Sequence, residues 1–197
     1  TLFYGEWSEG FRLGSPQVAF ALSSACDSDG NGLAELPDGS ELSIPKKVDP
    51  DQLENIELGT KVSLADSRIN ISAAIYRISW EGIPVQLGLV CGASATLNAG
   101  KSKSEGIEIE SKIILTENLR FDVNASYNET TLTEDAPGLG AGAIDGADLP
   151  GSADFNVTLG LEYAFVLSEA EAFLRVDYSY VGEYYGDFSE TGQNSGD

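Results

Sequence analysis

A run of oxygen-bearing side chains follows the first cysteine of the chain and has the spacing of a calcium-binding loop. Directly after Cys26 the sequence reads DSDGNG, with Gly32 at the sixth position of the loop. Alternate side chains of such a loop converge on one hard cation, so the spacing predicts a Ca²⁺ site. The expected ligands are Asp27, Asp29, Asn31, Glu35 and Asp38.

The same segment has a second interpretation as an acidic surface loop without a metal. Position 12 is Asp38 rather than the bidentate Glu of the usual loop, and Pro37 precedes it. No helical pattern flanks the segment, although helices normally hold such a loop. Both interpretations stay open at this point, and Ca²⁺ is the one cofactor that the sequence predicts.

Catalytic chemistry has few candidates, because the chain contains no His. Ser-His-Asp and Cys-His units and His-ligated zinc sites are therefore excluded. The neighbouring carboxylates Glu108 and Glu110 would suit acid–base work, but Lys112 follows closely and Arg120 would reach them from the next strand. We interpret them as water-facing charges and expect a binding protein rather than an enzyme.

The charge of the chain limits its partners. There are 32 Asp and Glu against 11 Lys and Arg, which gives a formal net charge of −21. Such a chain repels phosphate backbones, so we expect no nucleic-acid partner. Hydrophobic residues make up 42% of the sequence, which is too many for a disordered chain.

The elements that must position these residues are strands, because apolar residues recur with period two. Between residues 119 and 128, for example, Leu119, Phe121 and Val123 alternate with Arg120 and Asp122. Successive side chains of a strand point to opposite faces, so each strand has one apolar and one polar side. The pattern predicts about seven strands, at residues 2–13, 55–64, 68–76, 106–115, 119–128, 155–165 and 172–181.

The connections between these strands alternate in length. Short links at residues 65–67, 116–118 and 168–170 alternate with long stretches at 15–50, 84–98 and 129–151. Transmembrane β-barrels have short periplasmic turns and long extracellular loops. We therefore expect an all-β chain: an antiparallel, up-and-down segment of a transmembrane barrel.

Several segments resemble one family of outer-membrane proteins, the TonB-dependent receptors, in the order in which that family has them. Each motif alone is weak, but together they cover most of the chain. They are YGEWSEGFR at 4–12, VDPDQLENIELGTK at 48–61, AIYRISW at 74–80, NAG at 98–100, GIEIE at 106–110 and LP at 149–150.

This resemblance implies an outer-membrane receptor and transporter of a Gram-negative bacterium. The family imports a scarce ligand, such as a siderophore, cobalamin or an oligosaccharide, with energy supplied through TonB. The three long loops would contact the ligand, although the sequence identifies no single contact residue. The aromatic residues Trp7, Trp80, Tyr184 and Tyr185 would lie at the membrane interface.

The resemblance also implies that the chain is one part of a larger protein. The family has an N-terminal plug domain inside a barrel of 22 strands, and no segment here resembles the plug or the closing strand. The chain also contains no Met. We therefore expect residues 1–197 to be part of the barrel domain, with TonB bound through a missing N-terminal region.

Cys26 and Cys91 are the only cysteines, and both fall in loops assigned to the extracellular end. In an oxidising compartment two such loop cysteines predict a disulfide that pins the 15–50 loop to its neighbour. The alternative is two unrelated free thiols.

Two other classes of protein share parts of this pattern. A soluble, calcium-dependent β-sandwich binding module would bury the apolar face against a second sheet, and a passive porin would have neither plug nor TonB. Solvent exposure of Ile56, Leu58, Phe121 and Leu159 distinguishes the sandwich from the barrel, because a barrel presents these side chains to lipid.

Overall fold

The structure is a computed structural model that describes residues 1–17, 25–37, 39, 41–98, 100–136, 142–186, 188, 193 and 194. All regular elements in these ranges are strands. Within them there is no helix of the length and apolar character that a membrane-spanning helix needs. The prediction of an all-β chain is therefore confirmed.

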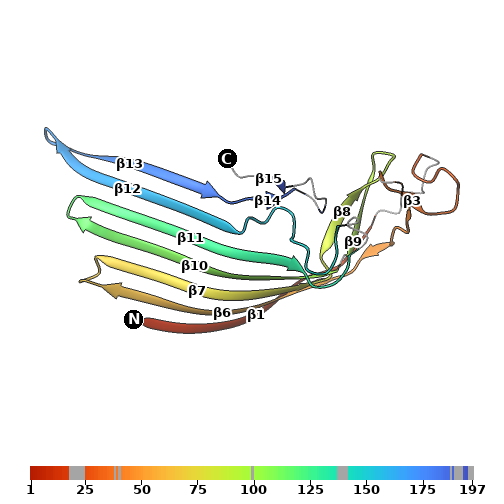
Figure 1. Cartoon of the computed structure of the whole chain (residues 1–197), viewed down its shortest axis with the longest axis horizontal. Helices are drawn as coiled ribbons and strands as arrows, with labels where there is room; N and C mark the ends of the chain where they lie inside the picture. The colour runs from red at the N-terminus through yellow and green to blue at the C-terminus, as the bar shows by residue number, and fades with distance from the viewer. Residues whose placement is uncertain are drawn as a thin grey trace.

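Seven long strands form one antiparallel sheet in which each strand pairs with the next long strand along the chain (Figure 1). This is the expected up-and-down order. The strands are β1 (Leu2–Arg12), β6 (Asp51–Leu64), β7 (Ile69–Glu81), β10 (Lys101–Thr116), β11 (Leu119–Leu132), β12 (Phe155–Leu167) and β13 (Ala170–Val181).

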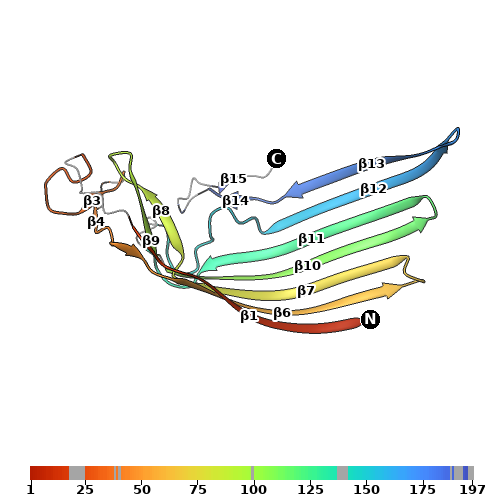
Figure 2. The same ribbon diagram turned by 180° about the vertical axis from the view of Figure 1, so that it is seen from behind.

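The short turns lie at one end of the sheet and the long connections at the other, as Figures 1 and 2 show. Four short pairs of strands lie in or beyond these connections. They are β2 (Ser15–Pro16) with β5 (Lys47–Val48), β3 (Ala34–Glu35) with β4 (Glu41–Leu42), β8 (Pro84–Gly88) with β9 (Ser94–Asn98), and β14 (Tyr184–Tyr185) with β15 (Gln193–Asn194).

The apolar side of the sheet, which we call the apolar face, is uncovered. Ile56 and Leu58 are 46% and 57% exposed, and Phe121 and Leu159 are only half-buried. The other sheets among the described residues have two strands each, and none of them pairs with or covers this one. A soluble sandwich would bury these side chains, so the structure does not favour that alternative.

Four strands extend further toward the long connections than their apolar alternation predicts. β6 begins at Asp51, β7 ends at Glu81, β10 begins at Lys101 and β11 ends at Leu132. Polar side chains such as Arg77 and Glu105 occupy the apolar face there, while the backbone pairing continues through them. The hydrophobic pattern therefore ends before the hydrogen-bonded ladder does.

Candidate functional site

The loop between β1 and β6 is covalently joined to the β8–β9 hairpin. Cys26 and Cys91 form a disulfide with their Cα atoms 4.9 Å apart, which confirms the predicted bridge. A small apolar core surrounds it, formed by buried Cys26, Ala34 and Leu89. The backbone N–H of Val90 also donates to the carbonyl of Glu35 at 3.1 Å. The two connections therefore form one packed unit, which we call the tethered loops (residues 15–17, 25–37, 39, 41–50 and 83–98).

A second set of contacts holds this unit near the end of the sheet. Asn98 accepts a hydrogen bond from the backbone N–H of Asp49 at 2.7 Å and donates from Nδ2 to the carbonyls of Asp49 and Gly82. The side chain of Gln17 accepts from the backbone N–H of Thr96 at 2.5 Å. Backbone N–H and C=O groups that have no partner in a sheet need other hydrogen-bond partners. The side-chain amides of Asn98 and Gln17 provide them between the two connections.

The ends of β1, β6 and β7 meet at a nearly buried carboxylate below the tethered loops. Asp51 is 7% exposed and accepts from Arg12 Nη2 at 2.6 Å and from Trp80 Nε1 at 2.7 Å. The Arg12 guanidinium also lies 5.5 Å from the centre of the Trp80 ring. A charge-assisted bond and a cation–π contact thus join three strands at one point.

This cluster differs from the expectation for Trp80. The residue pairs with Leu53 and Ser102 on the opposite side of the sheet from Ile56, so its indole is on the polar side rather than at a lipid-facing interface. Trp7, by contrast, lies on the apolar face and is 61% exposed. Sequence reasoning missed the Asp51 cluster because its three members are far apart in the chain.

In the acidic loop of the predicted calcium site, carboxylate side chains accept hydrogen bonds from backbone N–H groups of the same loop. Asp27 accepts from the backbone N–H groups of Asn31 and Gly32 at 3.0 and 2.9 Å, and Asp29 also accepts from Asn31. Glu35 accepts from the backbone N–H and hydroxyl of Ser28, which lowers the pKa of the Glu35 carboxyl. Asp38 lies outside the described residues.

Within the described ranges, no three acidic, Cys or His side chains are grouped in a way that would hold a metal ion. Their carboxylate oxygens are nevertheless the ligand type that Ca²⁺ takes. Calcium binding by Asp27, Asp29, Asn31, Glu35 and Asp38 therefore stays a prediction.

Calcium titration of the intact protein, with the tethered loops in place, tests this prediction. Weak binding, about 10⁻⁴ to 10⁻³ M, is expected because the loop lacks the bidentate Glu at position 12. Asp27→Asn should weaken it about tenfold, while Asp66→Asn, in a short turn at the opposite end, should leave it unchanged. If the Asp27→Asn variant and the unmodified protein bind Ca²⁺ equally, the predicted calcium site is wrong.

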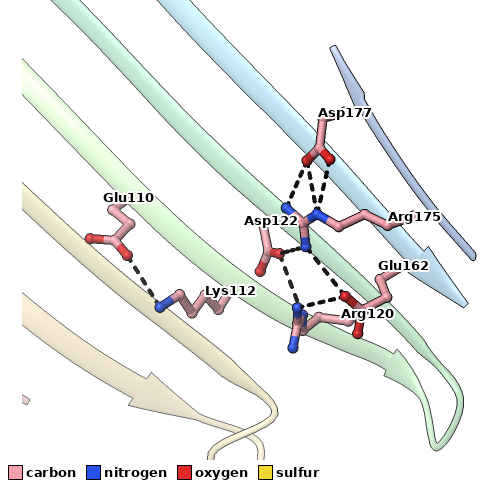
Figure 3. Close-up of polar contacts among 7 residues, drawn as sticks. All are labelled: Glu110, Lys112, Arg120, Asp122, Glu162, Arg175 and Asp177. Carbon is pink, nitrogen blue, oxygen red and sulfur yellow. Dashed lines mark hydrogen bonds and ion pairs between the residues drawn. The ribbon is translucent and has the colours of Figure 1, made fainter. Parts of the chain in front are cut away.

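The side of the sheet opposite the apolar face, which we call the polar face, carries a network of ion pairs across β11, β12 and β13 (Figure 3). Arg175 lies 3.0 Å from Asp122 and 2.7 Å from Asp177. Arg120 lies 3.0 Å from Glu162 and 3.4 Å from Asp122. The two guanidinium groups therefore neutralise much of the charge of three carboxylates on a partly hydrated surface.

The carboxylates of the sequence motif GIEIE have one of the two cationic neighbours that the sequence predicts. Arg120 does not contact them, because Glu162 and Asp122 hold that guanidinium. Lys112, the other expected neighbour, lies 3.5 Å from Glu110 (Figure 3). The Glu110–Lys112 ion pair lies on the polar face, which agrees with the interpretation of these charges as water-facing.

A cavity of about 460 Å³ hollows the polar face. Its wall includes Tyr4, Glu57, Lys61, Glu108 and Asn124. The phenol of Tyr4 donates to Glu57 at 2.6 Å, and its ring lies over Gly59 on the paired strand, where any larger side chain would collide with it. The cavity is therefore polar and mostly acidic, and suits water or a polar protein surface rather than an apolar ligand.

Comparison with known proteins gives one family and several similar structures. The family model described as "TonB dependent receptor-like, beta-barrel" matches residues 1–196. The probable TonB-dependent siderophore receptor PiuA of Acinetobacter baumannii is 29% identical over 87 residues, which is 44% of this chain and 11% of that protein.

Two solved structures share the fold of nearly the whole chain at 18% identity. One is the ferric yersiniabactin uptake receptor FyuA from Yersinia pestis, with a TM-score of 0.69 over 98% of this chain. The other is BauA, the ferric preacinetobactin receptor from Acinetobacter baumannii, with a TM-score of 0.65 over 99%. This chain spans 25% of each of those chains. At such identity the likeness shows the fold alone.

Proposed function

Since this chain belongs to the TonB-dependent receptor-like β-barrel family, whose model matches residues 1–196, we propose that it forms part of the barrel wall of an outer-membrane receptor in a Gram-negative bacterium. The apolar face would contact lipid, and the polar face would line the lumen. The single observation that carries this proposal is the long sheet with one uncovered apolar face and one charged, hollowed face. Such two-faced strands are typical of membrane barrels.

The proposal extends to uptake of a scarce small ligand with energy from TonB. The named relatives are receptors for ferric chelates, which supports a ferric siderophore ahead of cobalamin or an oligosaccharide. The tethered loops lie at the same end as the 133–154 connection, where a ligand would arrive from outside. The plug and the segment that binds TonB would be contributed by other parts of the intact receptor.

The acidic character of these loops supports a ligand that is cationic or bridged by a metal. Their described carboxylates include Asp27, Asp29, Glu35 and Glu41, with Lys46 and Lys47 at the base of the loop. An anionic ligand would be repelled over roughly 10 Å at moderate salt.

Uptake by cells that carry the intact receptor tests this proposal. We expect the initial rate of uptake of a radiolabelled ferric siderophore, from a panel that also contains cobalamin and oligosaccharides, to be at least about tenfold above that of a receptor-deleted strain. Deleting tonB, or adding a protonophore, should abolish this accumulation.

A passive porin gives the opposite result in the same experiment. Its transport would continue without TonB and without the proton gradient, and would show little preference within the panel. Accumulation that is unaffected by tonB deletion would therefore contradict the proposal and favour the porin.

A further inference from the structure

The connection between β11 and β12 returns along β11 before β12 begins. Asp148 forms an isolated antiparallel bridge with Thr131. Regular pairing with β11 starts only where Phe155 lies opposite Tyr127. Residues 149–154 therefore lie opposite residues 128–130, which are fewer, and the excess chain must leave the line of the sheet as it does in a β-bulge. We call residues 149–154 the strap.

The strap leaves the sheet toward the polar face. Ser152 accepts a hydrogen bond from Nδ2 of Asn128 at 2.9 Å and donates one to Oγ1 of Thr130 at 3.2 Å. Asn128 lies on the same side of β11 as Asn124, which lines the cavity of the polar face. Alternate residues of a strand share one face, so these contacts place the strap over the polar face rather than the apolar face.

The two strap contacts belong to a network of five side chains that uses all of its donor hydrogens. Tyr76 and Ser104 both donate to Oδ1 of Asn128. Asn128 donates from Nδ2 to Thr130 and to Ser152, each at 2.9 Å. Thr130 donates to Ser104 at 3.0 Å, and Ser152 closes the network through Thr130. A polar network in which each donor is satisfied holds its members in one arrangement.

Other interactions of the connection provide less apolar burial than a strand of the sheet would. Its core consists of buried Leu132, Ala136 and Ala143, two of which are small. Within the strap, the backbone N–H of Leu149 donates to Thr130 at 2.9 Å, and that of Gly151 donates to Tyr185 at 2.8 Å. Burial of so few methyl groups stabilises the connection only modestly, so side-chain hydrogen bonds to the strap contribute a large share of its local stability.

We propose that the Asn128 side chain positions the connection between β11 and β12 by holding the strap against the polar face, at the mouth of the lumen. This inference rests on the proposed function, in which the polar face lines the lumen. The donors and the acceptor of Asn128 are already paired, so it acts on the connection through Ser152 rather than as a ligand contact. Pairing of β10 with β11 continues through the backbone of Asn128, so loss of its side chain frees the strap and leaves the strands paired.

Hydrogen exchange of the intact receptor in detergent tests this proposal. Asn128→Ala should raise the exchange rate of the backbone N–H groups of Leu149 and Gly151 at least about tenfold, because the side-chain bonds that keep the strap closed are lost. The control is Asn124→Ala, which removes the same side chain from the same face of β11 but outside the network. Its exchange in the strap should stay within about twofold of that of the unmodified receptor. Heat-modifiable migration in detergent gels shows that each variant is folded.

Ser152→Ala provides a second test, because it breaks the strap contacts and leaves the bonds between the strands in place. It should also speed exchange in the strap, and the double variant should exchange more slowly than the product of the two single effects, since the two residues share one bond. Unchanged exchange in both single variants, equal effects of Asn124→Ala and Asn128→Ala, or independent effects in the double variant would overturn the proposal. These measurements need no ligand, so their failure leaves the proposed uptake standing. Absence of the receptor from the outer-membrane fraction would instead contradict the proposed function.

Discussion

Replacing Cys26 and Cys91 by Ser should lower the stability of the receptor and release the tethered loops. The disulfide closes a segment of 65 residues. A disulfide that closes a loop of that length lowers the entropy of the unfolded chain and raises the free energy of unfolding by about 4 kcal/mol. The small core around Cys26, Ala34 and Leu89 is too small to hold the two connections together without it. The variant should therefore unfold at a lower temperature and be cleaved within residues 25–37.

Reductant gives a matched control for this prediction. Dithiothreitol should produce the same protease sensitivity in the unmodified receptor and should not change the Cys26→Ser/Cys91→Ser variant. Cleavage in the short turns at residues 65–68 should stay low in both samples. If the unmodified and variant receptors melt together and resist protease equally, the disulfide does not tether these loops.

Asp51→Ala should cause the second large effect. It removes the acceptor of Arg12 and of the Trp80 indole where three strands meet. Loss of a nearly buried, hydrogen-bonded carboxylate costs about 1–3 kcal/mol when one partner, here Arg12 at 60% exposure, can return to water. We expect a lower melting temperature and faster proteolysis of the tethered loops directly above.

Two further variants test whether the lower stability of Asp51→Ala comes from the lost hydrogen bonds of Asp51. Asp51→Asn keeps the shape and one acceptor, so it should retain part of the stability. Glu6→Ala removes an exposed carboxylate from the same face of β1 and should have little effect. Equal melting temperatures for Asp51→Ala and Glu6→Ala would show that the cluster contributes nothing to holding the strand ends.

The long strands could be predicted from sequence because each one alternates along its own length. Residues 119–128 and 155–165 predict most of β11 and β12, since one face of each strand is apolar. The Cys26–Cys91 bridge, which the structure confirms, could be predicted because the chain has only one pair of cysteines. The alternation of short and long links placed both cysteines at the same end.

Contacts between distant segments could not be predicted in this way. Asp51, Arg12 and Trp80 come together only through strand pairing, and nothing in their local sequence marks them. The sequence assigns residues 84–98 to a long connection and does not predict the β8–β9 hairpin within it, because each of its strands has only five residues. Ion-pair partners such as Arg120 and Glu162 depend on register, which one residue of slip would change.

Accessibility of single cysteines along β11 tests the orientation of the two faces most directly. In the intact receptor in outer membranes, a single Cys would replace each of residues 123–128 in turn. The native Cys26 and Cys91 are bonded to each other and so do not react with a thiol reagent. Cysteines that replace Val123, Ala125 and Tyr127 should react with a thiol reagent dissolved in the membrane. Cysteines that replace Asn124, Ser126 and Asn128 should react with a water-soluble thiol reagent. This period-two pattern is the result we expect. Equal reaction of all six positions with the aqueous reagent, or protection of the apolar positions from both reagents, would contradict a sheet that faces lipid on one side and a lumen on the other.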